Sequence, residues 1–299
     1  MRNWHWSWLL MLFPGLLYAQ EGWILKEVRI VSPVENKVSD PVNIRISDGR
    51  IQAIEPYTAA ALLAEPGTVV EGRGGFVMAG MIDAHMHHFQ SGSLYTRPDA
   101  LDLRSIKPYP TELAETWSGL PEMWARYLRA GITRICDVGG PRQNFTLSAQ
   151  ADSLPSPDLY VAGPLISSYQ PAALRTNDPP ILLIKTAEAA RAEVERQLAA
   201  KPDFVKIWYI VFPGQNPETY LPVVKEAIKV SHAAGISVAV HATQLETARL
   251  AVEAGANILV HSVEDKVVDD AFVNLLKAKD VSCIPTLQVS GNYGKAFAG

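Results

Sequence analysis

The chain lacks several features that mark large classes of protein. Only two of its 299 residues are cysteines, Cys136 and Cys283, and both fall in strand-like segments far apart in the sequence. Two buried thiols are therefore favoured over a disulfide. The sequence contains no run of basic residues and its formal net charge is -4, which argues against a nucleic-acid partner.

Long apolar segments are also missing, with one short exception at the N-terminus. Arg2 precedes an apolar run from Trp8 to Tyr18, and the small residue Ala19 follows it, which is typical of a signal peptide. The run is short for a membrane anchor, and no cysteine follows it for lipid attachment. The sequence therefore predicts a signal peptide at residues 1–19, cleavage after Ala19, and a secreted or periplasmic mature chain without a stable membrane span.

The composition is that of a folded protein. Hydrophobic residues make up 48% of the chain and charged residues 19%, so a chain of this length can bury a full core. Residues 20–75 contain short strand-like runs around Asp48-Gly49, a dipeptide that favours hairpin turns. We expect this part to form a small β unit that packs on the rest of the chain.

From residue 76 onward, strand-like and helical segments alternate, which indicates parallel βα units. No Gly-x-Gly-x-x-Gly motif follows the first strand, so a (β/α)8 barrel of the TIM type is favoured over an open doubly wound sheet. An eighth strand is missing, and we therefore expect residues 76–299 to form an α/β barrel that lacks its last strand. The later predicted strands are residues 133–138, 159–165, 203–211, 236–242, 257–263 and 281–288, and the predicted helices are 120–130, 186–200, 217–234, 245–253 and 269–278.

The first predicted barrel strand ends in a pair of histidines. His85 and His87 are two residues apart, so on a β-strand both side chains point to the same face. Two neutral imidazoles on a rigid strand suit a divalent ion such as zinc, which needs further ligands from elsewhere in the chain. A single His-x-His pair also arises by chance, so its interpretation depends on the other strands.

Three further polar residues fall near the C-terminal ends of predicted strands, where TIM barrels place their active sites. Strand alternation leaves Lys206, His241 and His261 facing inward if the outward positions belong to Val205, Ile207, Val238, Val240, Ile258 and Val260. A buried lysine is costly unless it is paired or chemically altered, and the alternative is a lysine that extends its ammonium group to solvent. Beside a metal, a lysine can lose its proton and take up carbon dioxide, which gives a carbamate able to bridge two cations. Four histidines in matching phase favour metal ligation.

Four other polar residues near these strands receive simpler interpretations. His88 has the opposite phase to the histidine pair and His232 lies in a predicted helix, so no role at a metal is predicted for either. Asp83 is expected to share the inward face and to give structural support. Asp137 is expected either to cap the Gly-Gly turn that follows it or to hold a neighbouring ligand in place.

Several short motifs occur together in this chain. They are Asp48-Gly49-Arg50-Ile51, Met78-Ala79-Gly80-Met81-Ile82-Asp83-Ala84-His85-Met86-His87, Phe204-Val205-Lys206-Ile207, Val240-His241-Ala242 and Ala254-Gly255-Ala256-Asn257-Ile258-Leu259-Val260-His261. In this combination the chain from about Trp23 to the last predicted strand resembles the amidohydrolase superfamily, in particular its imidazolonepropionase-like and prolidase-like branch. The resemblance implies a metal-dependent barrel flanked by a β-sandwich built from both ends of the chain, with residues 20–75 as its N-terminal portion.

The resemblance also implies a set of metal ligands. His85 and His87 would bind one metal, His241 and His261 would bind the second, and a carboxylated Lys206 would bridge them. The expected cofactor is two Zn²⁺ ions, with Mn²⁺ or Fe²⁺ as alternatives. Lys206 and His261 are also the predicted catalytic residues.

Two departures from the family pattern bear on activity. Val260 and Ser262 flank His261, where the family usually has Glu and Gly. The family also places an aspartate after strand eight, where it ligates the first metal and takes a proton from the attacking water, and nothing in this sequence matches it. We therefore expect a truncated chain. The nearby acidic residues fall in a loop and a helix start after the sixth predicted strand and are expected to serve as caps: Glu264, Asp265, Asp269 and Asp270.

The function that the resemblance implies is hydrolysis of amide bonds in small peptides, N-acyl amino acids or cyclic amides. The partner would be a small-molecule or peptide substrate, and the sequence leaves the oligomeric state open. Residues 88–118, which are rich in proline, serine and tyrosine, are predicted to form a long loop, and this loop and the loop 213–220 are expected to shape the pocket. Two alternatives remain: hydrolysis of lactones or phosphoesters at the same metal site, and a catalytically incompetent, truncated remnant.

Overall fold

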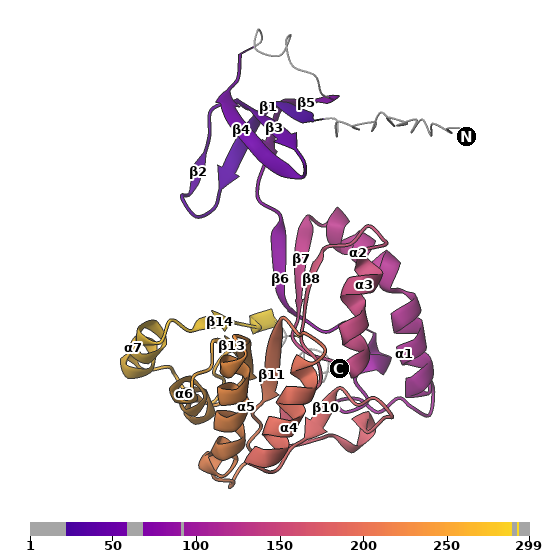
Figure 1. Ribbon diagram of the computed structural model, residues 1–299, viewed down its shortest axis with the longest axis vertical. Helices are drawn as coiled ribbons and strands as arrows, with labels where there is room; N and C mark the ends of the chain where they lie inside the picture. Colours follow the sequence, from indigo (N-terminus) through magenta and orange to yellow (C-terminus); the bar gives the residue numbers. More distant parts are fainter. Residues whose placement is uncertain (1–21, 59–67, 91–92, 289–291, 293–299) are drawn as a thin grey trace, which may run out of the picture. The chain divides into compact units, whose positions relative to one another are not determined.

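The computed structural model describes residues 22–58, 68–90, 93–288 and 292 (Figure 1). It divides into two compact units, Met1–Ala79 and Gly80–Gly299. The predicted signal peptide at residues 1–19, with its cleavage point after Ala19, lies outside the described residues. Within the described part of the chain, no helix is both long enough and apolar enough to span a bilayer.

The first unit is a five-stranded sheet built around one long strand, β1 (Trp23–Ser32). Strands β2 (Lys37–Val38) and β3 (Val42–Ser47) pair with β1 in antiparallel orientation, β4 (Arg50–Pro56) pairs with β3, and β5 (Thr68–Val77) runs parallel to β1. The predicted hairpin turn is confirmed, because Asp48 and Gly49 join β3 to β4 with φ angles of 52° and 68°. Both angles lie in the region that an Asp-Gly turn adopts readily.

The sequence predicts a short strand from Thr68 to Glu71, but the observed strand β5 is longer. It continues to Val77, and its residues Phe76 and Val77 lie opposite Arg29 and Ile30 of β1. This pairing gives the backbone N–H and C=O groups of these two residues hydrogen-bond partners on β1, so the residues extend β5 instead of starting the next strand. The next strand, β6 (Met81–Met86), therefore begins at Met81 rather than at Phe76.

The second unit contains two sheets, and every strand pairing between described residues in them is parallel. One sheet has the strand order β6-β7-β8, and the other has the order β10-β9-β11-β12-β13-β14. The strands are β7 (Ile132–Asp137), β8 (Asp158–Val161), β9 (Leu165–Ser167), β10 (Ile181–Leu183), β11 (Phe204–Trp208), β12 (Ser237–His241), β13 (Ile258–Val260) and β14 (Ser282–Ile284). Parallel strands alternating with helices make a TIM-like α/β architecture.

The strand predicted at residues 159–165 is interrupted. Its first part, β8, pairs with β7, whereas β9 pairs with β11 of the other sheet. Pro164 lies at the break, and proline has no N–H to donate to a strand ladder. One short segment of chain therefore contributes a strand to each sheet.

The five predicted helices are confirmed, with ends that differ by a few residues, and Figure 1 shows α4, α5 and α6 beside the six-stranded sheet. The helices are α1 (Tyr109–Ser118), α2 (Leu120–Arg129), α3 (Leu147–Ala151), α4 (Ala187–Leu198), α5 (Leu221–Ala233), α6 (Leu245–Ala254) and α7 (Asp270–Ala278). Short 3-10 helices are η1 (Leu94–Thr96), η2 (Arg142–Thr146), η3 (Ala172–Leu174) and η4 (Pro217–Tyr220).

Helix α1 lies within the segment 88–118 that the sequence predicts to be a loop, so this prediction is wrong for residues 109–118. The segment is rich in proline, and Pro110 occupies the first turn of the helix. The first turn tolerates proline because its N–H would have no partner within the helix. Proline, which favours a loop prediction when it is frequent, therefore lies in the first turn of a helix here.

The core confirms the predicted inward and outward faces of two central strands. Val205, Ile207, Val238 and Val240 belong to the cluster that packs against α4 and α5, whereas Phe204 and Ala239 belong to the cluster inside the sheet. Strand β13 has the opposite phase to the predicted one. Its residues Ile258 and Val260 lie in the inner cluster, and Leu259 packs against the helices.

Both cysteines are described, and neither forms a disulfide. Cys136 is half-buried beside the inner cluster, but Cys283 on β14 is exposed. The prediction of two buried thiols is therefore wrong for Cys283.

Candidate metal and active site

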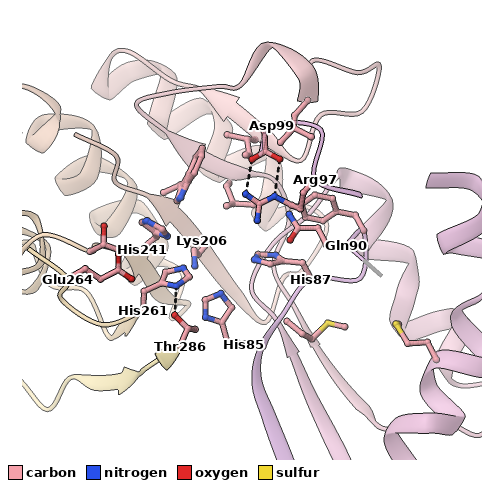
Figure 2. Close-up of a pocket in the computed structure, with 18 of the residues that line it drawn as sticks. His85, His87, Gln90, Arg97, Asp99, Lys206, His241, His261, Glu264 and Thr286 are labelled. Carbon is pink, nitrogen blue, oxygen red and sulfur yellow. Dashed lines mark hydrogen bonds and ion pairs between the residues drawn. The ribbon is translucent and has the colours of Figure 1, made fainter. Parts of the chain in front are cut away.

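The predicted ligands from four strands converge on one cavity of about 970 Å³. The ring centroids of His85 and His87 are 5.5 Å apart, those of His85 and His261 are 4.6 Å apart, and those of His241 and His261 are 4.2 Å apart. Figure 2 shows these rings around Lys206. All five side chains that the sequence singles out as metal ligands line this cavity.

Lys206 is the most unusual of the five. It lies in the middle of β11 and is only 1% exposed, and its Nζ atom has no hydrogen-bond partner among the described residues. Burial lowers the pKa of its amine to about 7. Such burial rules out a lysine that extends its ammonium group to solvent, because that arrangement keeps the charge in water.

His85 faces the cavity because the strand register shifts just before it. The pairing of β6 with β7 changes register between Asp83 and Met86, so Asp83 lies beside Ile135 on the helix-facing side of the sheet. Its carboxylate accepts a hydrogen bond from the Tyr127 hydroxyl on α2 at 3.1 Å and another from the backbone N–H of His85 at 3.1 Å. The predicted inward position of Asp83 is therefore wrong, although its predicted supporting role agrees with these contacts.

A backbone carbonyl orients His87. The Nδ1 atom of His87 lies 2.6 Å from the Gly139 carbonyl oxygen, which accepts hydrogen bonds and cannot donate them. The proton is therefore on Nδ1, and Nε2 keeps its lone pair. Gly139 has a φ of 116°, and a Cβ at this position would lie 2.6 Å from Leu165 Cδ1 and 3.0 Å from the Gly163 carbonyl oxygen.

We expect Gly139→Ala to destabilise the fold by about 1–3 kcal/mol, since alanine disfavours this φ and its Cβ meets a backbone atom. Urea denaturation monitored by circular dichroism measures the change. Gly214→Ala is the matched control, because Gly214 has a φ of 82° and open space around its position for a Cβ. Equal destabilisation by the two variants would show that the contacts around Gly139 contribute nothing.

His261 reaches the cavity by a different route from the one predicted. It follows the last residue of β13, and strand alternation would place it on the helix side together with Leu259. Its φ of 76° breaks the alternation and directs the ring into the cavity. Thr286, which follows β14, holds the ring by a contact of 2.8 Å between Oγ1 and Nδ1 (Figure 2).

His88, for which the sequence predicts no role at a metal, belongs to a buried chain of hydrogen bonds behind the histidine pair. The indole N–H of Trp124 donates to Nε2 of His88 at 3.0 Å, so the proton of His88 is on Nδ1, which donates to Asp137 Oδ2 at 2.7 Å. Asp137 also accepts from the backbone N–H groups of His88 and Gly139, each at 3.0 Å. Asp137 thus caps the turn, which is one of its two predicted roles, and it also fixes His88, the residue next to His87.

We expect Asp137→Asn to destabilise the fold by about 2–3 kcal/mol, because an amide has one acceptor oxygen where the carboxylate has two and must turn an N–H toward a buried donor. Thermal and urea unfolding measure the loss. The control is Asp158→Asn, whose carboxylate is 72% exposed and pairs with Arg134 at the surface, where a change below about 0.5 kcal/mol is expected. A neutral effect at Asp137 would contradict a structural role for this chain of bonds.

The segment 88–118 contributes to the cavity as predicted, through Phe89, Gln90, Arg97 and Asp99. The segment 213–220 does not, since none of these residues, all of which the structure describes, lines the cavity. It instead forms η4, where Tyr220 is buried in the helix-side core and the Pro217 carbonyl accepts from the Tyr209 hydroxyl at 2.6 Å.

The acidic residues after β13 differ in what they do. Asp269 accepts from the backbone N–H of Phe272 at 2.7 Å as the N-cap of α7, and Asp265 accepts from the N–H of Leu245 at 2.8 Å, so capping is confirmed for both. Glu264 lines the cavity, and its backbone N–H donates to the Thr243 carbonyl at 2.8 Å.

Several cavity residues escaped prediction because nothing in their sequence context marks them. Thr286 is the exception, since it lies just past the C-terminal end of β14, at the end of the strands where barrels place their chemistry. Arg97 and Asp99 come from an irregular segment whose path no periodicity predicts.

The protonation state of the four histidines at this cavity suits metal binding. Burial lowers the pKa of His87 to about 4 and that of His261 to about 3, and it also lowers the pKa values of His85 and His241. All four rings are therefore neutral at pH 7, which is the form that binds metal. The buried Nδ1 of His85, like the amine of Lys206, has no hydrogen-bond partner among the described residues.

Within residues 22–58, 68–90, 93–288 and 292, no three His, Cys, Asp or Glu side chains are placed to share one metal ion. The predicted arrangement assigns two histidines to each metal, so it does not require three such side chains at one ion. Lys206, once carboxylated, is the ligand that the two metals would share.

Comparisons with known proteins agree with the fold. Residues 76–281 match the sequence model of the amidohydrolase family, so the chain belongs to this family. A comparison with curated protein sequences gives no match.

Solved structures share the fold at low sequence identity. They include a candidate prolidase from Bifidobacterium longum with 22% identity and a TM-score of 0.65, over 90% of this chain and 62% of that one. A Xaa-Pro dipeptidase with bound methionine has 16% identity and a TM-score of 0.70, over 90% and 67% of the two chains. The A. niger ochratoxinase has 15% identity and a TM-score of 0.70, over 92% and 67%. The chain thus spans 62% to 67% of the length of these structures.

Proposed function

We propose that this chain belongs to a metal-dependent hydrolase of carbon–nitrogen bonds that cleaves amides in small peptides, N-acyl amino acids or cyclic amides. Membership of the amidohydrolase family supports this reaction class. Two proteins of similar fold, a Xaa-Pro dipeptidase and phenylurea hydrolase B, are named for hydrolysis of such bonds.

The observation that carries the proposal is the burial of Lys206 among four neutral imidazoles. A lysine amine that is 1% exposed and lacks a hydrogen-bond partner among the described residues has no structural role that repays its desolvation. With a pKa of about 7, a large fraction of this amine is neutral at physiological pH. A neutral amine attacks carbon dioxide, forming a nitrogen–carbon bond and losing one proton, and the carbamate that results is an anionic oxygen ligand.

In this proposal His85 and His87 would hold one divalent cation, His241 and His261 would hold the other, and a carboxylated Lys206 would serve as a ligand to both. Bound Zn²⁺ ions supply a polarised scissile carbonyl and a lowered pKa for the attacking water. The chain's own residues keep this chemistry in place: Gly139 fixes the tautomer of His87, and Thr286 orients His261. Phe89 and Trp208 add apolar surface to the cavity wall.

The test is an assay of the purified chain, loaded with zinc or manganese, against panels of dipeptides, N-acyl amino acids, cyclic amides, lactones and phosphoesters. We expect turnover of amides and about two metal equivalents per chain. His241→Ala should lose both, whereas His232→Ala should keep them, because His232 is exposed on α5 and contacts Asn257. Turnover of lactones or phosphoesters alone would favour the second candidate, and less than one equivalent without turnover would favour the remnant.

We also infer that the mature protein is exported after cleavage following Ala19. The inference rests on the N-terminal sequence alone. N-terminal sequencing of the protein from the periplasm or culture medium of the source cells should give a first residue of Gln20. A chain that retains Met1 in the cytoplasm would contradict it.

A further inference from the structure

A second cavity, of about 790 Å³, lies within the second unit and shares no lining residue with the cavity of the histidines, here called the first cavity. Helix α1, the start of η2, and η3 with the segment that follows it form most of its wall. The volume falls in the range of about 300–1,000 Å³ that sites for small molecules have. The proposed hydrolysis uses none of the side chains in this wall.

One part of the wall of the second cavity is apolar and rigid. Pro108, Pro110 and Pro141 line it, and proline has no backbone N–H to offer a ligand. Leu113 and Trp117 lie one helical turn apart on α1 and add an aliphatic and an aromatic surface. Proline rings and an indole present broad apolar faces, so this part of the wall favours a flat apolar group.

Two of the three charged side chains in the wall already have partners. The carboxylate of Asp178 accepts hydrogen bonds from the backbone N–H groups of Arg142 and Gln143, at 2.9 Å and 3.0 Å. Arg104 donates from Nε and Nη2 to the two carboxylate oxygens of Asp102, at 2.8 Å and 2.6 Å. These two charges are therefore compensated within the protein.

The third charged side chain, Arg175, is exposed and forms no hydrogen bond or ion pair with any residue that the structure describes. Beside it in the wall, the Oγ1 atom of Thr176 is buried and also has no hydrogen-bond partner among the described residues. A guanidinium group and a hydroxyl group both donate to a carboxylate. The polar part of the wall thus complements an anion.

The two cavities share one cluster of apolar side chains. Tyr109 and Leu113 of this cluster line the second cavity, and the other members line the first: Leu165, Leu174, Ile181 and Trp208. Burial raises the pKa of the Tyr109 phenol, and the charge of Asp99, which lines the first cavity, adds to this rise. Tyr109 therefore contacts one cavity and lies close to the wall of the other.

Helix η3 connects the cavities in the same way. Leu174 lines the first cavity, whereas its neighbours Ala173 and Arg175 line the second. A ligand that fills the second cavity occupies the space into which Tyr109 and Leu174 can retreat. Its presence therefore stiffens the wall that a substrate meets in the first cavity.

We propose that the second cavity binds a small aromatic carboxylate, with its ring against Leu113 and Trp117 and its carboxylate on Arg175, and that the bound molecule regulates the first cavity. The binding is independent of the proposed function, whereas the regulation of turnover rests on it. The ligand class follows from the wall, because an apolar ring alone leaves Arg175 without an anion and a small anion alone leaves the apolar surface uncovered.

The first experiment measures binding to the metal-loaded protein by calorimetry with three probes. They are 2-naphthylacetate, the uncharged 2-(2-naphthyl)ethanol and acetate, none of which contains an amide bond. We expect 2-naphthylacetate to bind about 10-fold or more tightly than either of the others, since only this probe has both the ring and the anion. Equal binding of the naphthyl acid and alcohol, or no binding of the acid, would overturn the proposal.

Two variants with matched controls locate the bound probe. Arg175→Gln should abolish the preference for acid over alcohol, whereas Arg129→Gln should keep it, because Arg129 is 62% exposed on α2 and lines neither cavity. Ala114→Trp fills the second cavity from an exposed position of α1 and should weaken binding about 10-fold or more. Ala189→Trp, at an exposed position of α4 outside both cavities, should not. Tight binding that survives both Arg175→Gln and Ala114→Trp would place the probe in the first cavity and overturn the proposal.

The second experiment measures turnover of the best amide substrate at rising concentrations of 2-naphthylacetate. We expect KM to rise about 3-fold or more and then reach a plateau, with a smaller change in kcat and no effect in Arg175→Gln. A KM that is unchanged, or that rises without a plateau as in competition for the first cavity, would overturn the regulation. Binding by a protein that hydrolyses no amide would count against the proposed function alone, and turnover without binding would count against the second site alone.

Discussion

Replacing Lys206 with alanine is expected to lower amidase activity by at least roughly 10³-fold and to reduce bound zinc to about one equivalent per chain or less. The reason is that the donor set assigns only two histidines to each metal, and both metals depend on the modified lysine for a further ligand. Inductively coupled plasma mass spectrometry measures the metal content, and kcat/KM on the best amide substrate measures the activity. Short carboxylic acids added to the variant should restore part of both, because they replace the missing carboxylate in the vacated space.

The control for this prediction is Lys229→Ala. Lys229 lies on α5 with a side chain that is 72% exposed, so its loss should change neither metal content nor activity. Circular dichroism establishes whether Lys206→Ala is folded, which separates a lost ligand from a lost structure. A folded Lys206→Ala with unchanged zinc and unchanged kcat/KM would refute the proposed site.

Replacing Lys206 with methionine is expected to make the metal-free protein more stable at pH 6 by about 2–4 kcal/mol. The pKa of the amine falls from 10.5 in an exposed lysine to about 7 in the fold, so between these values the unfolded chain binds more protons than the folded one. Stability of the unaltered protein therefore rises with pH across this window, and the cost of the lysine is fully present below pH 7. Methionine has a similar shape and no charge, so it removes this cost.

Urea unfolding at pH 6, 8 and 10 measures this second effect in chelator-treated protein. The stability difference between Lys206→Met and the unaltered chain should shrink as pH rises from 7 to 10. Lys229→Met, at an exposed position, should show no difference that depends on pH. A difference at Lys206 that stays constant with pH, or a less stable Lys206→Met at pH 6, would show that the buried amine is not desolvated.

The positions of Lys206 and His241 follow from the sequence because their strands are regular. On β11 and β12 the valines and isoleucines face the helices without interruption, so strict alternation places the polar residues inside. The same logic fails for Asp83 and His261. A register shift in β6 and a positive φ after β13 each change the side of the sheet to which the side chain points. Neither feature can be recognised from the pattern of apolar and polar residues.

The segment 88–118 shows a second limit of sequence reasoning. Its composition predicts a loop near the pocket, which is right for Arg97 and Asp99 and wrong for helix α1. Proline content alone cannot distinguish a first helical turn from a loop, since both accept a residue without an N–H. Which of its side chains face the histidines depends on the path of the backbone, to which no periodic pattern applies.

By itself, the sequence determined the order of strands and helices, the family and the five ligand candidates, because hydrophobic periodicity and the local motifs around histidine and lysine are properties of short segments. The tertiary structure alone decided how His261 enters the cavity, that Asp137 and Trp124 hold His88, and that Arg97 lies beside His87. Those facts depend on backbone angles and on contacts between residues distant in the chain, and such contacts form only when the whole unit is packed.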